Sequence, residues 1–142
     1  MNNLYLDTNI FIYLSDENSP YFSVCAKLIE YCQAKRIPLS TCTETFQEII
    51  HLYKNLKQLD EGLRIAEYAL ELADFIYPIT TETIEIYLSK AKIYKTSSSR
   101  DLIHLSVGVE NKLNKIISID KDFRRFKEIK ILKPDEFLAH IG

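Results

Sequence analysis

The sequence predicts an α/β fold, a three-layer α/β/α sandwich with a short, mostly parallel central sheet and more helix than strand. Short apolar segments of strand length alternate with longer segments that repeat apolar residues at helical spacing. The chain has only three glycines and four prolines, so we expect short connections. Its 142 residues, 46% of them hydrophobic, are expected to form one domain, residues 1–142.

The first half of the chain is expected to supply two strands and three helices. Pro38 suits the first part of a strand, where its missing N–H does not interrupt pairing. In the last of these helices we expect Leu63, Ala66, Leu70 and Ala73 to face inward. The predicted elements are a strand at 3–6, a helix at 21–36, a strand at 37–41 and helices at 43–56 and 60–75.

The second half continues the alternation of strands and helices. The last helix is expected to begin at Pro134, a residue that suits the first helical turn. Strands separated by helices favour parallel pairing, with helices on both faces of the sheet. The predicted elements are a strand at 76–80, helices at 81–94 and 97–113, a strand at 115–120, a short helical turn at 121–126 and a strand at 129–132.

Composition excludes several classes of protein. No apolar run approaches the roughly 20 residues that span a bilayer, and Asp7 interrupts the N-terminal apolar stretch. We therefore expect no membrane association and a cytoplasmic location. The three cysteines are odd in number and lack paired zinc-ligand spacing, which argues against a disulfide framework and against a zinc site.

Charge is distributed unevenly, although the net charge is only −2. Residues 1–94 carry 8 basic and 13 acidic side chains, whereas residues 95–142 carry 10 basic and 7 acidic ones. The basic excess centres on residues 121–133. It is either a solvated surface or a patch that binds phosphates.

Two aspartates follow predicted strands. Asp7 comes directly after the first strand, and Asp120 ends the strand predicted at 115–120. Ligands of open parallel sheets bind beyond the carboxyl ends of the strands. We therefore expect both carboxylates at one site, although a strand that ends in solvent could also finish with aspartate.

Acids also recur near the starts of predicted helices. Glu44 and Glu48 lie in the first turns of the helix at 43–56, and Asp101 lies in the first turn of the helix at 97–113. Thr41-x-x-Glu44 and Ser98-x-x-Asp101 fit capping boxes, a structural role worth about 1 kcal/mol. Glu48 lies deeper than a cap, so it is the preferred functional acid, with Glu44 as the alternative.

Acids that converge in this way need a compensating charge. Two carboxylates about 4 Å apart repel by roughly 4 kcal/mol at an effective dielectric constant near 20. Protons or a cation must offset this repulsion, and a ligand set made only of oxygens suits Mg²⁺ or Mn²⁺. The sequence therefore predicts a site for Mg²⁺ or Mn²⁺ made by Asp7, Glu48, Asp101 and Asp120.

These motifs resemble the PIN-domain family of metal-dependent ribonucleases over essentially the whole chain. Asp7-Thr8-Asn9 after the first strand is similar to the family's N-terminal Asp-Thr-Asn. Glu48-Ile49 resembles its helical glutamate. The remaining matches are Asp101 with His104 in a helix, and Ser118, Asp120, Asp122 and Phe123 after a strand.

The resemblance implies a compact nuclease that hydrolyses RNA phosphodiester bonds with Mg²⁺ or Mn²⁺. Many such proteins are dimeric and form the toxin half of a VapBC-type toxin–antitoxin pair. It further implies an RNA substrate, a cognate antitoxin and a homodimer. Supporting roles follow in the same way. Thr8 or Asn9 would orient Asp7, and Ser118 would orient Asp120.

Other residues are candidates for auxiliary or RNA-binding roles. We expect Asp122 to cap the helical turn at 121–126 and His104 to be structural, with roles at the site as alternatives for both. Tyr13 and Tyr53 are the tyrosines best placed to stack on unpaired bases. The cations that could contact RNA phosphates near the acids are Arg100, Lys121, Arg124 and Arg125.

Three other functions compete with this interpretation. A phosphatase of the haloacid-dehalogenase type also starts with a strand-terminal aspartate, but it needs a second Asp where this chain has Asn9. A catalytically silent PIN-like module would bind RNA or protein without cutting, although all four acids are present. A plain α/β scaffold whose acids only cap helices would not bind divalent cations tightly.

Overall fold

The structure, a computed structural model, describes residues 3–141 and contains a parallel sheet of five strands. Their spatial order is β3-β2-β1-β4-β5, and every neighbouring pair is parallel. The α/β/α prediction is therefore confirmed. The strands are β1 (Leu4–Leu6), β2 (Leu39–Cys42), β3 (Phe75–Tyr77), β4 (Lys115–Ile117) and β5 (Lys130–Leu132).

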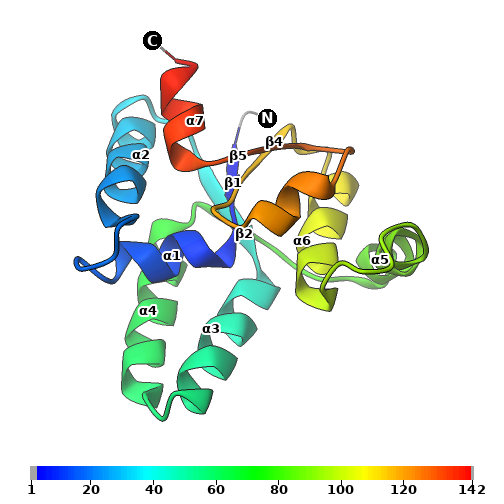
Figure 1. The fold of residues 1–142 in the computed structure, drawn as a ribbon, viewed down its shortest axis with the longest axis horizontal. Helices are drawn as coiled ribbons and strands as arrows, with labels where there is room; N and C mark the ends of the chain where they lie inside the picture. The colour runs from blue at the N-terminus through cyan, green and yellow to red at the C-terminus, as the bar shows by residue number, and fades with distance from the viewer. Residues whose placement is uncertain (1–2, 142) are drawn as a thin grey trace.

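Helices outnumber strands and connect them (Figure 1). In register, Leu4 lies opposite Leu39, and Tyr5 lies opposite both Ser40 and Ile116, which puts β1 at the centre of the sheet. The helices are α1 (Thr8–Leu14), α2 (Phe22–Ala34), α3 (Thr43–Asn55), α4 (Leu59–Leu72), α5 (Thr81–Ile93), α6 (Ser99–Glu110) and α7 (Pro134–Ala139), with a 3₁₀ helix η1 (Lys121–Arg125).

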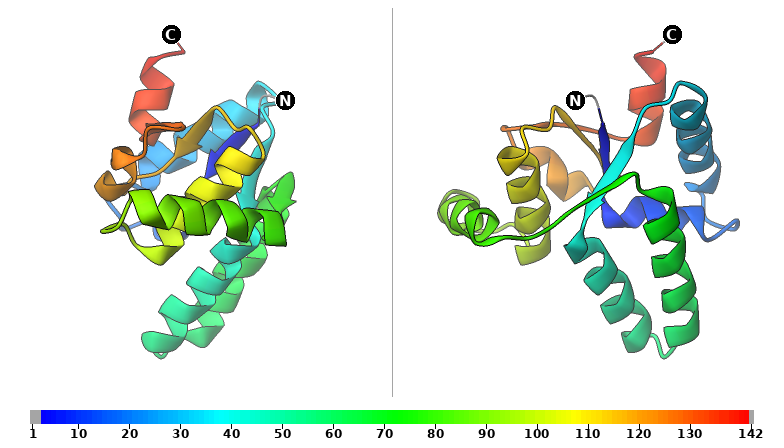
Figure 2. Two further views of the ribbon diagram at one scale, coloured as in Figure 1. Left: turned by 90° about the vertical axis from the view of Figure 1, so that its right-hand side faces the viewer. Right: turned by 180° about the vertical axis from the view of Figure 1, so that it is seen from behind.

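The alternation of side chains along β1 divides the core into two layers. Leu4 and Leu6 join a cluster with residues of α1, α2, α4 and α7. Tyr5 points to the other face and joins a cluster with residues of α6 and η1. Views from two further sides show α5 and α6 on the opposite side of the sheet from α2 (Figure 2). No helix within residues 3–141 is long and apolar enough to cross a membrane.

Helix α4 buries a different face from the one predicted. Ile65 and Ala69 are buried, whereas Leu63 and Leu70 are 44% and 59% exposed. The leucines of this helix occur on more than one face, so the apolar pattern alone does not select the buried side. The contact with α3 selects it, because Gly62 of α4 lies directly against Tyr53.

Two strand boundaries also differ from the prediction. The helix expected to reach residue 75 ends at Leu72, and β3 begins at Phe75 and ends before Pro78, which cannot donate a ladder hydrogen bond. The strand expected at 115–120 stops at Ile117. Asp120 therefore lies in the loop beyond the strand.

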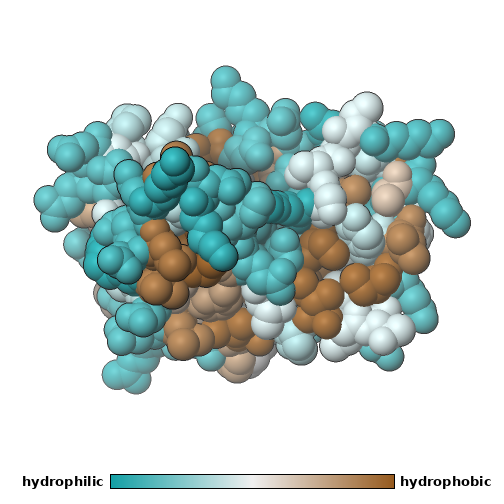
Figure 3. Space-filling view, turned by 90° about the horizontal axis from the view of Figure 1, so that it is seen from below, coloured by the Kyte–Doolittle hydropathy of each residue, from teal (hydrophilic) through white to brown (hydrophobic). Residues whose placement is uncertain are grey.

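Exposed apolar side chains gather on the face shown in Figure 3. The α3–α4 hairpin projects from the rest of the fold in Figure 1 and carries several of them. Because a monomer gains nothing from exposed leucines, this face is suited to contact with another protein. The exposed leucines and isoleucines of the hairpin and of α5 are Leu52, Leu56, Leu59, Leu63, Leu70, Ile84, Leu88 and Ile93.

The close approach of α3 and α4 at Gly62 generates a prediction. A Cβ atom at Gly62 would lie 2.6 Å from Tyr53 Cβ, an atom fixed by its backbone. Gly62→Val should therefore separate the two helices and lower the free energy of unfolding by about 2 kcal/mol, as overpacking does. Urea unfolding followed by circular dichroism would measure the loss. Glu67→Val, at an exposed position of the same helix, is the control, and an equal loss in both variants would contradict the prediction.

Candidate active site

Asp7 is a buried carboxylate at the junction of β1 and α1. It is 5% exposed, and its extended backbone makes it the N-cap of α1. Its Oδ1 accepts a hydrogen bond from the Thr8 backbone N–H at 2.7 Å, and its Oδ2 accepts from Ser118 Oγ at 2.6 Å and from Asn9 Nδ2 at 3.2 Å. Burial raises the pKa of Asp7, whereas His104 and the Ser118 hydrogen bond oppose the rise.

The expected orienting residues therefore converge on one acid. Asn9 contacts Asp7 as expected, and Thr8 does so through its backbone N–H. Ser118 was expected to orient Asp120, but its hydroxyl donates to Asp7 and accepts the backbone N–H of Asp120 at 3.1 Å. One serine thus fixes the Asp7 carboxylate and the start of the Asp120 loop.

His104 of α6 is fully buried and connects three elements. Its Nε2 lies 2.6 Å from Glu48 Oε1 and 3.7 Å from Asp7 Oδ1, and its Nδ1 lies 2.5 Å from the Tyr5 hydroxyl. The expectation of a structural histidine agrees with this geometry. Because the ring bridges β1, α3 and α6, it also fixes the position of the Glu48 carboxylate.

Protonation of His104 changes the charge balance of the site. Burial opposes the charged ring, but interactions with Tyr5 and Cys42 and the hydrogen bond to Glu48 outweigh it, so the pKa of His104 is raised well above its usual value. A protonated ring would add a positive charge beside Asp7 and Glu48 and would offset part of the repulsion between these two acids.

Glu44 does not cap α3. Cys42 occupies the N-cap position, and the Thr41 hydroxyl instead donates to the Leu6 carbonyl at 3.1 Å and lies 2.7 Å from the Thr45 hydroxyl. The capping box predicted for Thr41 and Glu44 is wrong, because the threonine side chain turns into the sheet. Burial and then the charge of Glu48 raise the pKa of Glu44, which places the two glutamates near each other.

Asp101 is a partly buried acid in the first turn of α6. Ser98 caps this helix, and its hydroxyl accepts the Asp101 backbone N–H at 3.1 Å, which confirms the Ser98 half of the predicted capping box. Burial, followed by the charges of Asp7 and Asp120, raises the pKa of Asp101 to about 6. The three aspartates are therefore close enough to repel one another.

Asp120 caps η1, where Asp122 was expected to do so. Its carboxylate accepts the Asp122 backbone N–H at 2.9 Å, and Asp120 directly precedes the first residue of η1. The prediction for Asp122 is wrong because this residue already lies inside the first turn. Its carboxylate instead lies 3.4 Å from Arg125.

Two of the four candidate RNA-binding cations are occupied. Arg124 pairs with Glu136, and Arg125 contacts Asp122 and the Thr96 hydroxyl. Within residues 3–141, no ion pair shorter than 4 Å involves Arg100 or Lys121, and both are exposed. Arg100 and Lys121 are consequently the candidates best able to meet a phosphate.

The oxygen atoms of the acids are of the type that hard divalent cations prefer, although the side chains are not arranged around a common point. In the described part of the chain, no three His, Cys, Asp or Glu side chains stand close enough to hold a metal ion together. Asp7, Glu48, Asp101 and Asp120 nevertheless offer only oxygen atoms, which Mg²⁺ and Mn²⁺ prefer. Burial, and then the charges of Asp7 and Asp120, disfavours the ionised form of Asp101, and a bound cation would favour that form again.

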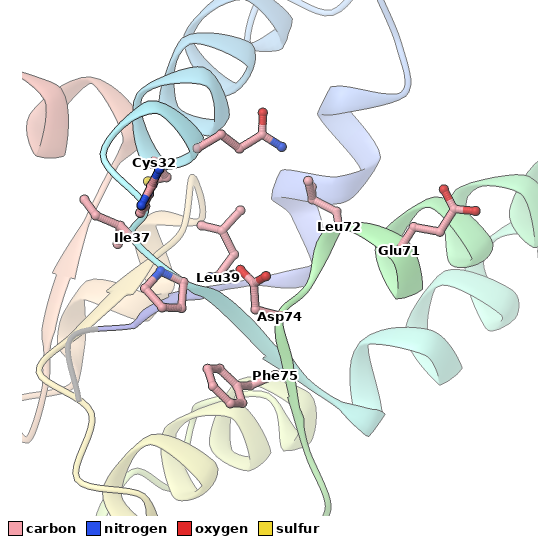
Figure 4. Close-up of a pocket in the computed structure, with 10 residues that line it drawn as sticks. Cys32, Ile37, Leu39, Glu71, Leu72, Asp74 and Phe75 are labelled. Carbon is pink, nitrogen blue, oxygen red and sulfur yellow. Dashed lines mark hydrogen bonds between the residues drawn. The ribbon is translucent and has the colours of Figure 1, made fainter.

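Hollows lie at both edges of the sheet, but they differ in chemistry. At the edge where β2 begins, a hollow of about 550 Å³ is lined by Ile37, Leu39, Asp74 and their neighbours (Figure 4). The Asp74 carboxylate there accepts the Leu39 backbone N–H at 2.8 Å, a structural contact. The four acids of the site do not line this hollow; Asp120 lines a different one at the carboxyl edge.

Sequence reasoning missed the buried polar residues that support the acids. Tyr5, Thr45 and Cys42 all contact His104 or Thr8, and all are fully buried. Tyr5 lies in an apolar strand and looks like a core residue in the sequence. Thr45 follows Glu44 in the first turn of α3, and this pair of polar residues was the available signal of a polar end to the helix.

The fold is a parallel α/β/α sandwich, and acids gather at the carboxyl ends of its strands. These two features are typical of proteins that bind a divalent cation at this edge of the sheet. Comparison with known proteins identifies the family, because residues 4–129 match the PIN-domain model. The chain belongs to the PIN-domain family.

Individual relatives agree with this assignment. Ribonuclease VapC13 of Mycobacterium tuberculosis is 27% identical over 127 residues, which cover 89% of this chain and 97% of the relative. The structure of VapBC2 from Rickettsia felis, bound to a promoter DNA fragment, matches with a TM-score of 0.75 at 13% identity, covering 92% of this chain and 97% of that one. VapC20 of M. tuberculosis matches with a TM-score of 0.70 at 15% identity, covering 89% and 98%.

The raised pKa of Asp101 predicts how the stability of the cation-free protein depends on pH. Its pKa rises from 3.8 to about 6 on folding, so the ionised group destabilises the fold. The protonated Asp101 carboxyl carries no such penalty, so the stability of the fold is unaffected by this group below pH 3.8 and falls as the pH rises through about 6. Asp101→Asn should therefore raise the free energy of unfolding at pH 7.5 by on the order of 1 kcal/mol, after solvent screening. Urea unfolding in EDTA would measure the gain.

The gain should shrink as the pH falls toward 4, where wild-type Asp101 is protonated. Mn²⁺ should stabilise the wild-type protein more than the variant, because the cation relieves the same repulsion. Glu85→Gln, at an exposed position of α5, is the control for removing a surface charge. A gain that is independent of pH would contradict the assignment.

The buried bridge through His104 gives a second prediction for this site. His104→Leu preserves bulk but leaves Glu48 and Tyr5 without their shared partner, and breaking a buried pair costs about 3 kcal/mol. Thermal unfolding would measure the loss. Tyr5→Phe, which removes a single hydroxyl, should cost about 1 kcal/mol. Equal losses in the two variants would show that the contact with Glu48 contributes nothing.

Proposed function

We propose that this protein is an endoribonuclease that hydrolyses RNA phosphodiester bonds and depends on Mg²⁺ or Mn²⁺. One observation carries the proposal. A chain of the PIN-domain family brings Asp7, Glu48, Asp101 and Asp120 to the carboxyl edge of its sheet, where burial and then the charges of Asp7 and Asp120 raise the pKa of Asp101.

Relatives support the choice of RNA as the substrate. The M. tuberculosis relative VapC13 is named a ribonuclease, and VapC20 is described as a toxin that cleaves the sarcin–ricin loop. The retained acids argue against a catalytically silent module. Asn9, which binds Asp7, occupies the position where a haloacid-dehalogenase-type phosphatase needs its second aspartate.

The side chains divide the work of the site. Thr8, Asn9 and Ser118 hold the Asp7 carboxylate in one orientation, and His104 does the same for Glu48. Asp7, Glu48, Asp101 and Asp120 would hold the cation, with Glu44 as a further acid near Glu48.

The remaining groups serve the substrate and the reaction. A divalent cation supplies a water of lowered pKa and stabilises the charge that develops on the phosphate. Arg100 and Lys121, exposed near the acids, would attract the RNA backbone before cleavage. Because neither side chain forms an ion pair within residues 3–141, both charges are available to bind phosphate.

We further propose that the protein is a cytoplasmic toxin held by a cognate antitoxin. Several solved structures with this fold are VapBC complexes, including one from nontypeable Haemophilus influenzae. The exposed leucines of the α3–α4 hairpin and the apolar residues of α5 offer surface for an antitoxin and for a second copy in a homodimer. Three unpaired cysteines suit a reducing compartment.

Cleavage of a mixed, structured RNA pool tests the proposed activity. The purified protein should cut RNA with Mn²⁺ or Mg²⁺ and should not cut it in EDTA. Asp7→Asn and Asp120→Asn should each reduce the cleavage rate by at least about 100-fold, because each removes an anionic ligand but retains a side chain that can cap a helix. Gel electrophoresis of the products would measure the rates.

Controls separate catalysis from folding and from contaminating nucleases. Each variant must match the wild-type protein in thermal unfolding. Asp74→Asn, at the opposite edge of the sheet, should cut at the wild-type rate if it folds normally. Cleavage that survives both substitutions at Asp7 and Asp120, or that persists in EDTA, would contradict the proposal.

A further inference from the structure

A hollow of about 510 Å³ adjoins the acids on the side of α1 and η1. We call it the tyrosine hollow. Its volume lies in the range of pockets that hold small organic groups. It is lined by Asn9, Tyr13, Tyr21, Ile119, Asp120, Lys121 and Asp122.

Two aromatic rings form one side of the tyrosine hollow. The rings of Tyr13 and Tyr21 lie 4.9 Å apart, centre to centre, at an angle of 53°. Tyr13 is half-buried on α1, whereas Tyr21, just before α2, is 41% exposed. Because the two rings contact each other and Tyr21 is partly exposed, they present an aromatic surface to solvent in the structure as it stands.

The remaining walls tie this aromatic surface to the proposed site. Asp120, one of the four acids, lines the same hollow, and Asn9 contacts Asp7. Lys121 adds an exposed cation, and the nearby negative charge of Asp122 is offset by Arg125. Tyr13 lines the same hollow as Asp120, and burial is the main cause of the raised pKa of Tyr13.

We propose that the tyrosine hollow binds one unpaired RNA base next to the phosphate that is cut, with the base stacked on Tyr21 and Tyr13 as the second wall. The proposal rests on the ribonuclease function above. An aromatic platform suits an unpaired base because a paired base in a helix has its faces covered. Lys121 would meet the phosphate of the stacked nucleotide. The protein would therefore cut at unpaired nucleotides.

A second hollow suggests the direction in which the RNA continues. It measures about 280 Å³ and shares Tyr21 and Ile119 with the tyrosine hollow. Lys133, Pro134 and Asp135, at the start of α7, also line it. The strand would leave the acids over Tyr21 and pass toward Lys133.

Binding of a short fluorescein-labelled single-stranded RNA, followed by anisotropy, tests the tyrosine hollow. The Asp101→Asn background prevents cleavage during the measurement. Tyr21→Leu should weaken binding at least about fivefold, the lower limit for loss of one base–aromatic stack. Tyr68→Leu, at a tyrosine of α4 with 37% exposure, should leave binding unchanged.

Tyr21→Trp protects the test against a folding defect. The natural chain has no tryptophan, so this variant carries a single indole at the proposed platform. It should bind RNA at least as tightly as the parent, and RNA should quench its fluorescence. An RNA with one abasic position at the stacked nucleotide should bind Tyr21→Leu and the parent with equal affinity, since the lost stack is then absent from both.

Failure of the subsite and failure of the nuclease proposal give different results. If the wild-type protein cuts RNA but Tyr21→Leu binds as the parent does, the subsite is wrong and the nuclease proposal stands. Tyr21→Leu could also bind more weakly than the parent to every RNA, wherever the abasic position is placed. The loss would then come from a change in structure and not from a lost stack, which also overturns the subsite. If the wild-type protein neither cuts nor binds RNA, both proposals fall.

Discussion

A carboxylate buried at the end of the central strand is the constraint on which the rest of this structure depends. Asp7 is 5% exposed, and a charge removed from water in this way is tolerated only with good hydrogen bonds and a nearby opposite charge. Thr8 and Asn9 supply hydrogen bonds from the following helix, Ser118 supplies one from the loop after β4, and His104 of α6 would supply a positive charge when protonated. The order of β1 next to β4 is what brings Ser118 within reach.

The same compensation divides the acids into two groups. Asp7 and Glu48 both lie within 4 Å of the His104 ring. Asp101 and Asp120 form the second group, and burial, followed by the charges of Asp7 and Asp120, raises the pKa of Asp101. A protonated His104 would offset the charge of Asp7 and Glu48, whereas within residues 3–141 no ion pair involves Asp101 or Asp120.

Local patterns in the sequence predicted the α/β/α fold and the four acids, because strand, helix and capping signals are short-range. Ser98 as the cap of α6 is one example. The errors arose where distant contacts decide the outcome. The buried face of α4 depends on Gly62 meeting Tyr53, and the Thr41 hydroxyl turns toward Leu6 of a neighbouring strand. The bridge from Tyr5 to Glu48 spans three elements, so no window of sequence contains it.

Asp7 caps α1 in addition to its proposed role at the site, and this limits which substitutions of Asp7 the fold would tolerate if the activity were lost. It caps α1, and replacing such a cap by alanine costs about 1 kcal/mol. Asparagine or serine would preserve most of the cap while removing the charge. A lineage that abandoned catalysis would therefore drift first to Asn or Ser at this position. Asn or Ser at position 7 of a relative would then indicate a domain that has lost its activity but kept the helix cap.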